Sequence, residues 1–170
     1  KKTVNFDDPG TYHLYYGDES GRPGSLMTFF PWRGIQQGRI GAGQSTSTAF
    51  SVPAGSLGWW VDHFASVGAE ARITSTSSSE ERLLVHDPDG LQIELVATHE
   101  HDPRDPWDSA SVPAEHAIRG QHSSVLTVRD AEQTIALMVN DLGMRVVEQE
   151  GNRTRLAAGE GMPGALVDVH

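Results

Sequence analysis

The stretch QSTSTAFSVPAGSLGWWVDHFASVG, residues 44–68, joins a strand pattern to a helix pattern. In its first part small residues alternate with larger ones such as Thr48 and Phe50, and this period of two is typical of a half-buried strand. In its second part apolar side chains recur at helical spacing, with Ser56 placed to cap the start and Gly68 placed to end the helix. The stretch therefore predicts a strand followed directly by an amphipathic helix.

Three strand-like runs follow this helix: ARITSTSSS (71–79), ERLLVHD (81–87) and LQIELVA (91–97). Residues 121–170 then repeat the same order of elements. They begin with the strand-like QHSSVLTV, continue with a helix pattern that Asp130 is placed to cap, and end with three more strand-like runs. Because glycines close both predicted helices at equivalent places, we interpret the pattern as a duplicated βαβββ unit, called a module below.

The remaining segments fit the same scheme. Residues 1–40 have the composition of the last three strands of a truncated first module, and residues 41–98 make a complete second module. Residues 99–119 are rich in Pro, Asp and Ser, which predicts a linker, and residues 120–170 make the third module. The sequence thus predicts an α+β fold of repeated modules. Since the chain lacks an initial Met and ends in what reads as a strand, we expect a fragment of a longer protein.

Composition narrows the classes of partner. The chain has 170 residues, 13 basic and 23 acidic side chains, and a formal net charge of −10. This balance argues against nucleic acid or an anionic membrane as partner, because both favour clustered Lys and Arg. Cysteine is absent, which excludes disulfides and thiolate metal sites and fits a cytoplasmic protein. No apolar run approaches the roughly 20 residues that span a bilayer.

The repeated βαβββ module resembles the vicinal-oxygen-chelate superfamily, which includes glyoxalases, bleomycin-resistance proteins and extradiol dioxygenases. Four stretches are similar to bacterial ring-cleaving dioxygenases of the hydroquinone-dioxygenase type: KKTVNFDDPGTYHLYYGD, PGSLMTFFPW, DPDGLQIELVA and AIRGQHSSVLTV. Together they span nearly the whole chain. The first is long and specific, whereas DPDGLQIEL occurs across the superfamily.

The resemblance implies an Fe(II)-dependent enzyme that cleaves hydroquinone- or catechol-like aromatic rings. In such proteins two His and one Glu hold the iron, and the open positions on the metal accept the hydroxylated ring and O2. The matching His-His pairs are expected before residue 1 and after residue 170. We therefore expect no iron and no activity in this fragment alone, and Fe(II) in the complete protein. The small aromatic substrate and a homo-oligomer are the expected partners.

Three residues are candidates for the substrate pocket. His13 and Tyr15 share one face of a predicted strand, and Asn5 lies on the neighbouring one. The functional interpretation places them around an aromatic substrate, and it depends mostly on the resemblance. The alternative is a strand histidine hydrogen-bonded to the backbone.

Two residues are vestigial candidates for a metal site. Alternation places Glu94 on the cavity side of its strand, and its position matches the metal carboxylate of the superfamily. The His counterpart falls near Ser47, and a hydroxyl is a poor ligand for iron. His122 opens the third module, but by register Ser123 matches the ligand position. We expect Glu94 to be a hydrogen-bonded or solvated acid rather than a working ligand.

Two other interpretations stay open. A non-enzymatic module of the same fold could bind a small aromatic compound or support dimerisation. The linker histidines His99, His101 and His116 could suggest metal, but the surrounding Pro, Asp and Ser favour a solvated loop.

Overall fold

The computed structural model describes residues 1–75, 80–99, 102–107 and 111–170, so His101 and part of the predicted run 71–79 lie outside the described residues. The chain divides into two compact units, Lys1–Arg39 and Ile40–His170. Among the described residues, no helix is long and apolar enough to span a bilayer.

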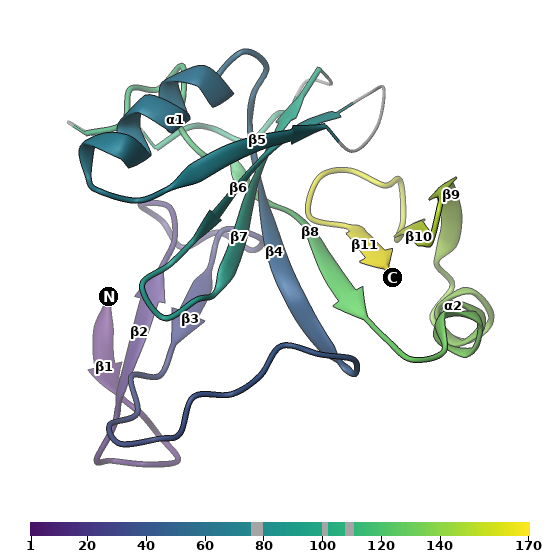
Figure 1. The fold of residues 1–170 in the computed structure, drawn as a ribbon, viewed down its shortest axis with the longest axis horizontal. Coiled ribbons are helices and arrows are strands. Elements are labelled where there is room, and N and C mark those ends of the chain that lie inside the picture. The colour runs from purple at the N-terminus through teal and green to yellow at the C-terminus, as the bar shows by residue number, and fades with distance from the viewer. Residues whose placement is uncertain (76–79, 100–101, 108–110) are drawn as a thin grey trace. The chain divides into compact units, whose positions relative to one another are not determined.

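The unit Lys1–Arg39 is a small antiparallel sheet. Its strands are β1 (Lys2–Val4), β2 (Tyr12–Tyr16) and β3 (Met27–Phe29), in the order β1-β2-β3 (Figure 1). Directly paired residues share a face, so the register places His13 with Thr3 and Tyr15 with Thr28. The opposite face carries apolar and aromatic side chains: Val4, Tyr12, Leu14, Tyr16 and Phe29.

The unit Ile40–His170 contains the two complete copies of the repeat. The first half comprises five elements: β4 (Gln44–Pro53), α1 (Leu57–Ser66), β5 (Ala71–Ser75), β6 (Glu80–His86) and β7 (Gln92–Thr98). The second half comprises the other five: β8 (Gly120–Thr127), α2 (Ala131–Asn140), β9 (Arg145–Glu150), β10 (Arg153–Ala157) and β11 (Leu166–Val169). Each half has the order that the sequence predicts, and the α+β, glyoxalase-like fold class is confirmed.

All eight strands form one sheet in the order β5-β6-β7-β4-β8-β11-β10-β9. In each half the last strand runs parallel to the first, and the two first strands, β4 and β8, pair antiparallel at the centre. An approximate twofold axis between β4 and β8 therefore relates the halves (Figure 1). The predicted boundaries 41–98, 99–119 and 120–170 stay a prediction, because both halves belong to one continuous sheet.

One face of this sheet packs apolar side chains under the helices. Leu83 and Leu95 are directly paired and fully buried, and α1, with its buried Leu57 and Trp60, contacts β5 and β6. Alternation sends the neighbours Arg82 and Glu94 to the opposite face. In the second half Leu156 and Val169 are likewise buried, but α2 has no buried side chain.

The helix starts differ from each other. Asp130 caps α2 as predicted, because its side chain accepts a hydrogen bond from the Gln133 amide at 3.1 Å. Ser56 stands at the N-cap position of α1, as predicted, but its hydroxyl makes no cap hydrogen bond to the helix. Ser56 Oγ instead donates to the Glu115 carbonyl at 3.3 Å, so the serine ties the start of α1 to the segment before β8.

Candidate functional site

The unit Lys1–Arg39 gathers His13 and three other aromatic residues. Tyr15 Oη lies 2.7 Å from His13 Nδ1, the His13 ring stacks on Phe30 at 4.1 Å, and Phe30 stacks on Trp32 at 5.3 Å. His13 Nε2 is buried and has no hydrogen-bond partner among the described residues. A buried polar nitrogen without a partner is costly, so this ring has an unused donor or acceptor beside a flat aromatic surface.

Asn5 lies on the same face of the small sheet, but its hydrogen bonds go to residues of the adjoining turn. Its side chain is 7% exposed, and its Oδ1 accepts a hydrogen bond from the Asp7 amide at 3.2 Å. Its own amide donates to the Thr11 carbonyl at 2.8 Å. Asn5 therefore shapes the turn between β1 and β2, and its place in a substrate pocket stays a prediction.

In the unit Ile40–His170, the sheet face that bears Glu94 carries a network of buried charges, called the charged face below. Arg82 is 2% exposed, and its guanidinium contacts Glu94 at 2.7 Å, Glu80 at 2.9 Å and Asp168 at 3.5 Å. Gln92 Nε2 donates to the other oxygen of Glu94 at 3.3 Å. Glu94 is thus ion-paired with Arg82 and hydrogen-bonded to Gln92, and its vestigial role stays a prediction.

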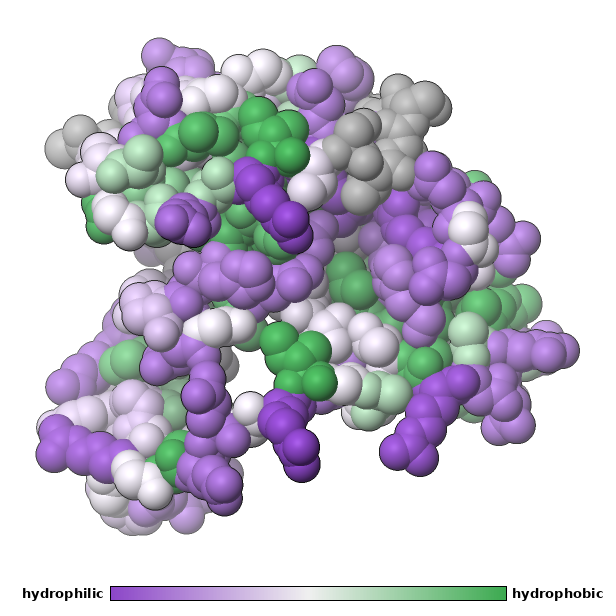
Figure 2. Space-filling model, in the orientation of Figure 1, coloured by the Kyte–Doolittle hydropathy of each residue, from purple (hydrophilic) through white to green (hydrophobic). Residues whose placement is uncertain are grey.

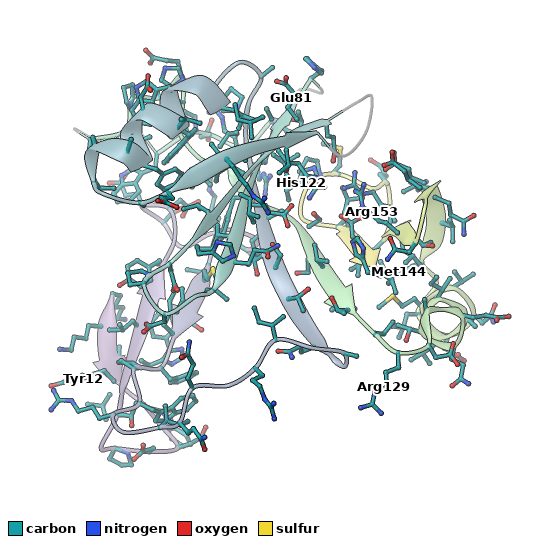
Figure 3. All side chains as sticks on the ribbon, in the orientation of Figure 1. Tyr12, Glu81, His122, Arg129, Met144 and Arg153 are labelled. Carbon is teal, nitrogen blue, oxygen red and sulfur yellow. The ribbon has the colours of Figure 1, made fainter. Side chains whose placement is uncertain are left out.

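Two further arginines meet Asp168 from β10. Arg155 makes a bidentate pair with it, at 2.7 and 3.0 Å, and Arg153 Nη2 donates to it at 3.1 Å. Arg155 also reaches Glu80 at 2.6 Å. His122 Nε2 lies 3.4 Å from Glu80, and its Nδ1 lies 3.1 Å from Ser123 Oγ. Figure 3 shows His122 and Arg153 between β6 and the β9–β10 hairpin.

These contacts fix the acids in their charged form. Burial alone would raise the pKa of Glu94, but the hydrogen bond and positive charge of Arg82 hold it below its usual range. Burial likewise opposes ionisation of Asp168, but the hydrogen bonds of Arg155 and the positive charges of Arg155, Arg153 and Arg82 together lower its pKa. The pKa of Glu80 is lowered in the same way, against burial, by His122 and Arg155.

The charged face has two hollows beside the network. The larger, of about 640 Å³, is bordered by Glu80, His99, His122 and Arg155. The smaller, of about 290 Å³, is bordered by Arg82, Glu94 and Asp168 among others. Across the part of the chain that the structure describes, no group of three or more His, Asp or Glu side chains is arranged to hold a metal ion.

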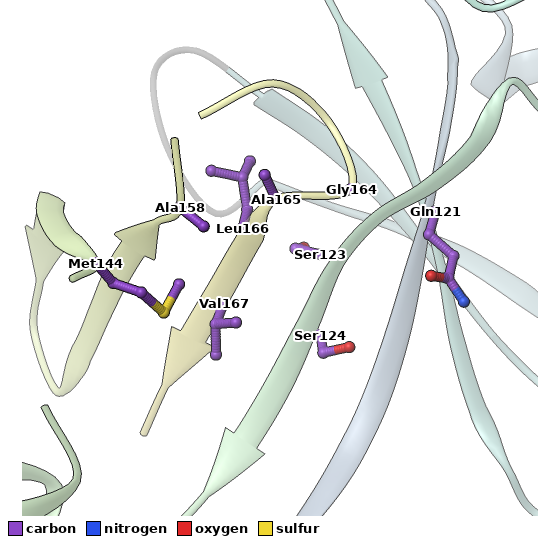
Figure 4. A pocket seen from close by; sticks show the side chains of 9 residues that line it. All are labelled: Gln121, Ser123, Ser124, Met144, Ala158, Gly164, Ala165, Leu166 and Val167. Atoms are coloured by element: carbon purple, nitrogen blue, oxygen red, sulfur yellow. The ribbon is translucent and has the colours of Figure 1, made fainter. Parts of the chain in front are cut away.

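A third hollow, of about 220 Å³, lies over β8 and β11 (Figure 4). In the close view the Met144 side chain extends toward Val167 from the neighbouring hairpin. The described residues that line it carry no acidic or basic side chain. It therefore offers no group for proton transfer.

The predicted linker packs on α1 through His116. The Trp60 indole donates to the His116 carbonyl at 2.9 Å. Trp59 stacks on His116 at 4.9 Å and on His63 at 4.7 Å, so two imidazoles flank its ring. His99 borders the larger hollow, whereas His116 packs against α1. Among the described residues, neither histidine belongs to a group that could hold a metal ion.

The sequence interpretation missed Arg82, Arg153 and Arg155 and their partner Asp168. Charged residues at alternate positions could have indicated this network. Glu80 and Arg82 share one face of β6. Arg153 and Arg155 share one face of β10 in the same way. An interior strand with such a charged face requires counter-charges on the neighbouring strands.

Comparisons with known proteins agree with this fold. No protein-family model matches the chain. Over 170 residues the chain is 36% identical to MhqE of Bacillus subtilis, which is named a ring-cleaving dioxygenase, and covers 55% of it. Over 173 aligned residues it is 34% identical to the chlorohydroquinone/hydroquinone 1,2-dioxygenase of Sphingobium indicum and covers 54% of it.

Comparison with solved structures agrees with these sequence similarities. A dioxygenase crystal structure from Bacillus subtilis matches with a TM-score of 0.90 at 36% identity, over 99% of this chain and 54% of that one. A glyoxalase I from Zea mays matches with a TM-score of 0.69 at 16% identity, over 99% and 56% of the two chains. The chain spans about half the length of the curated relatives it matches. Over that half the chain is homologous to proteins named ring-cleaving dioxygenases, and its fold is glyoxalase-like.

Proposed function

We propose that the protein, in its full natural length, is an Fe(II)-dependent dioxygenase that cleaves hydroquinone- or catechol-like aromatic rings. The observation that carries this proposal is the 36% identity to a ring-cleaving dioxygenase over 100% of the chain. The similarity to a chlorohydroquinone/hydroquinone 1,2-dioxygenase suggests the substrate class.

Among the described residues, no group of His, Asp or Glu side chains is arranged as an iron site. The carboxylates that could contribute, Glu94 and Asp168, are paired with buried guanidinium groups. We therefore propose that the Fe(II) ligands lie outside these 170 residues. The ion would supply coordination of the ring hydroxyl and of O2 at neighbouring positions.

The contribution that we propose for this chain is a wall of the substrate pocket. The stacked rings of His13, Phe30 and Trp32 offer a flat apolar surface for an aromatic ring. In this proposal the buried, unpartnered His13 Nε2 hydrogen-bonds a phenolic hydroxyl, and Tyr15 fixes the orientation of the imidazole through Nδ1. Asn5 would hold the turn that borders this wall.

The direct test is O2 uptake by the full-length protein, reconstituted anaerobically with Fe(II) and mixed with hydroquinone, chlorohydroquinone or catechol. We expect one O2 consumed per ring opened, together with the ultraviolet absorbance of the ring-opened product. Binding of hydroquinone without O2 uptake would instead indicate a non-enzymatic binding module.

The His13→Phe variant tests the pocket wall separately. It keeps the ring stack but removes both nitrogens, so we expect KM for hydroquinone to rise roughly tenfold or more, the usual effect of one lost hydrogen bond to a substrate hydroxyl. Iron content should not change. The matched control is Tyr12→Phe, on the opposite face of β2. An unchanged KM in His13→Phe would remove this residue from the pocket.

A further inference from the structure

Glu94 and Asp168 occupy equivalent positions in the two halves of the unit Ile40–His170. Each lies on the last strand of its half and is in register with the first strand, Glu94 with Ala49 and Asp168 with Val125. The twofold axis between β4 and β8 therefore relates the two acids. Paired carboxylates on facing strands are a donor set that divalent cations bind, and the resemblance places a metal ligand at this position.

The side chain between these acids is an arginine. Arg82 Nη1 lies 2.7 Å from Glu94 Oε2, and Arg82 Nη2 lies 3.5 Å from Asp168 Oδ2. We infer that the charged face is not a metal site, and that the Arg82 guanidinium takes the place of the cation between the two carboxylates. This inference concerns only the two halves of the unit Ile40–His170. The proposed Fe(II) ligands lie outside these 170 residues.

Asp168 is already bound by three arginines. Arg155 Nε donates to Oδ1, and Arg155 Nη2, Arg153 Nη2 and Arg82 Nη2 all reach Oδ2. Each carboxylate oxygen offers about two lone-pair positions, so Oδ2 has none left and Oδ1 keeps one beside its bond to Arg155. Asp168 is 0% exposed, so a hydrated ion could not approach it without displacing an arginine.

The other potential ligands are equally unsuited. Ser47 and Ser123 stand on the first strands where the family would place imidazoles, and a hydroxyl competes poorly for iron or zinc. Arg82, Arg153 and Arg155 place three positive charges among the three acids Glu80, Glu94 and Asp168. The charges of these six side chains are balanced, so a divalent cation would have to separate a guanidinium from its carboxylate in a poorly solvated place.

The network also joins the two halves. Arg155 of β10 pairs with Glu80 of β6, which is 75 residues away, and Arg82 of β6 reaches Asp168 of β11, which is 86 residues away. The guanidinium bridges therefore perform the cross-linking that a shared metal ion would provide between two facing strands. They do so without dependence on metal supply.

The first experiment counts metal in the full-length protein. Wild type, Glu94→Gln and Asp168→Asn are dialysed against Mn(II) or Fe(II), and bound metal per chain is measured by elemental analysis. We expect the same number of bound ions in all three proteins. Loss of one equivalent in a folded Glu94→Gln variant, judged by circular dichroism, would overturn the inference.

The second experiment tests the guanidinium bridge by a double-mutant cycle. Arg155→Met should lower Tm by roughly 10 °C, because it removes the Arg155 bonds of the buried Asp168 and of Glu80, and Glu80→Gln should lower Tm less in that variant than in wild type. Arg145→Met is the matched control, because Arg145 borders the same hollow but bonds only backbone carbonyls among the contacts described. Equal losses of Tm from Glu80→Gln in both backgrounds would overturn the bridging role.

The two proposals fail separately. If Glu94→Gln loses both iron and ring cleavage, the charged face is the metal site, and the dioxygenase proposal stands while this inference falls. If no substrate supports O2 uptake but the double-mutant cycle shows that Arg155 and Glu80 are coupled, the inference stands and the function falls.

Discussion

Asp168 shows how the surroundings of one residue determine its chemistry. An acid at the end of a cavity-side strand is a metal ligand where imidazoles surround it, and a structural ion where guanidinium groups do. Here three arginines surround it, so its negative charge stabilises the fold.

The lowered pKa values of Glu80, Glu94 and Asp168 predict a pH dependence of stability. A depressed folded-state pKa adds stability that is present above the unfolded value, which is about 4 for Asp and Glu. That stability is lost as pH falls toward the folded-state pKa values. We therefore expect the free energy of unfolding in urea to decline below about pH 5 and to keep declining in stronger acid. A flatter profile is expected for Asp168→Asn, and a wild-type profile without acid loss would contradict this assignment.

At the scale of elements, periodicity predicted the helices and strands because burial of one face imposes it. Phe50 and Val52 alternate on β4, and Leu57 and Trp60 lie one turn apart on α1. Capping was less predictable. Asp130 has only its own helix to bond, whereas the Ser56 hydroxyl is used by Glu115, 59 residues away. No local pattern contains that partner.

The charged face was unpredictable for the same reason. The alternation of Glu80 with Arg82 reads as a solvated strand face when each strand is considered alone. β6 and β10 are not neighbours in the strand order, so only the three-dimensional structure shows that Arg155 bonds Glu80. His13 and Tyr15, two residues apart, could be paired from the sequence because a strand places them side by side.

The attachment of α1 to the segment before β8 predicts a difference between its two tryptophans. Trp60 is 5% exposed and donates to the His116 carbonyl, so Trp60→Ala should cost about 3–5 kcal/mol through the cavity and the lost bond. Trp59→Ala removes only a half-buried stack on His63 and His116, and about 1 kcal/mol is expected. Urea unfolding measures both, and equal costs would contradict the packing described.

At the scale of the whole molecule, the apolar face of the unit Lys1–Arg39 predicts self-association of this 170-residue chain. Val4 is 58% exposed and Tyr16 is 59% exposed, whereas the helix-covered strands of the other unit bury Leu83 and Leu95 almost completely. Figure 2 shows hydrophobic residues interspersed with hydrophilic ones on the face in view. A face of this composition gains free energy when it is covered.

We expect the same face of a second copy to cover it, because short, exposed sheets readily pair with each other. Multi-angle light scattering should therefore give a mass above 18.4 kDa, rising with protein concentration. The double substitution Val4→Lys and Tyr16→Lys should restore the monomer mass through like-charge repulsion and loss of apolar area. Leu137→Lys, at an exposed site on α2, is the control and should leave association unchanged. A wild-type chain that stays monomeric at every concentration would show that this face needs no partner.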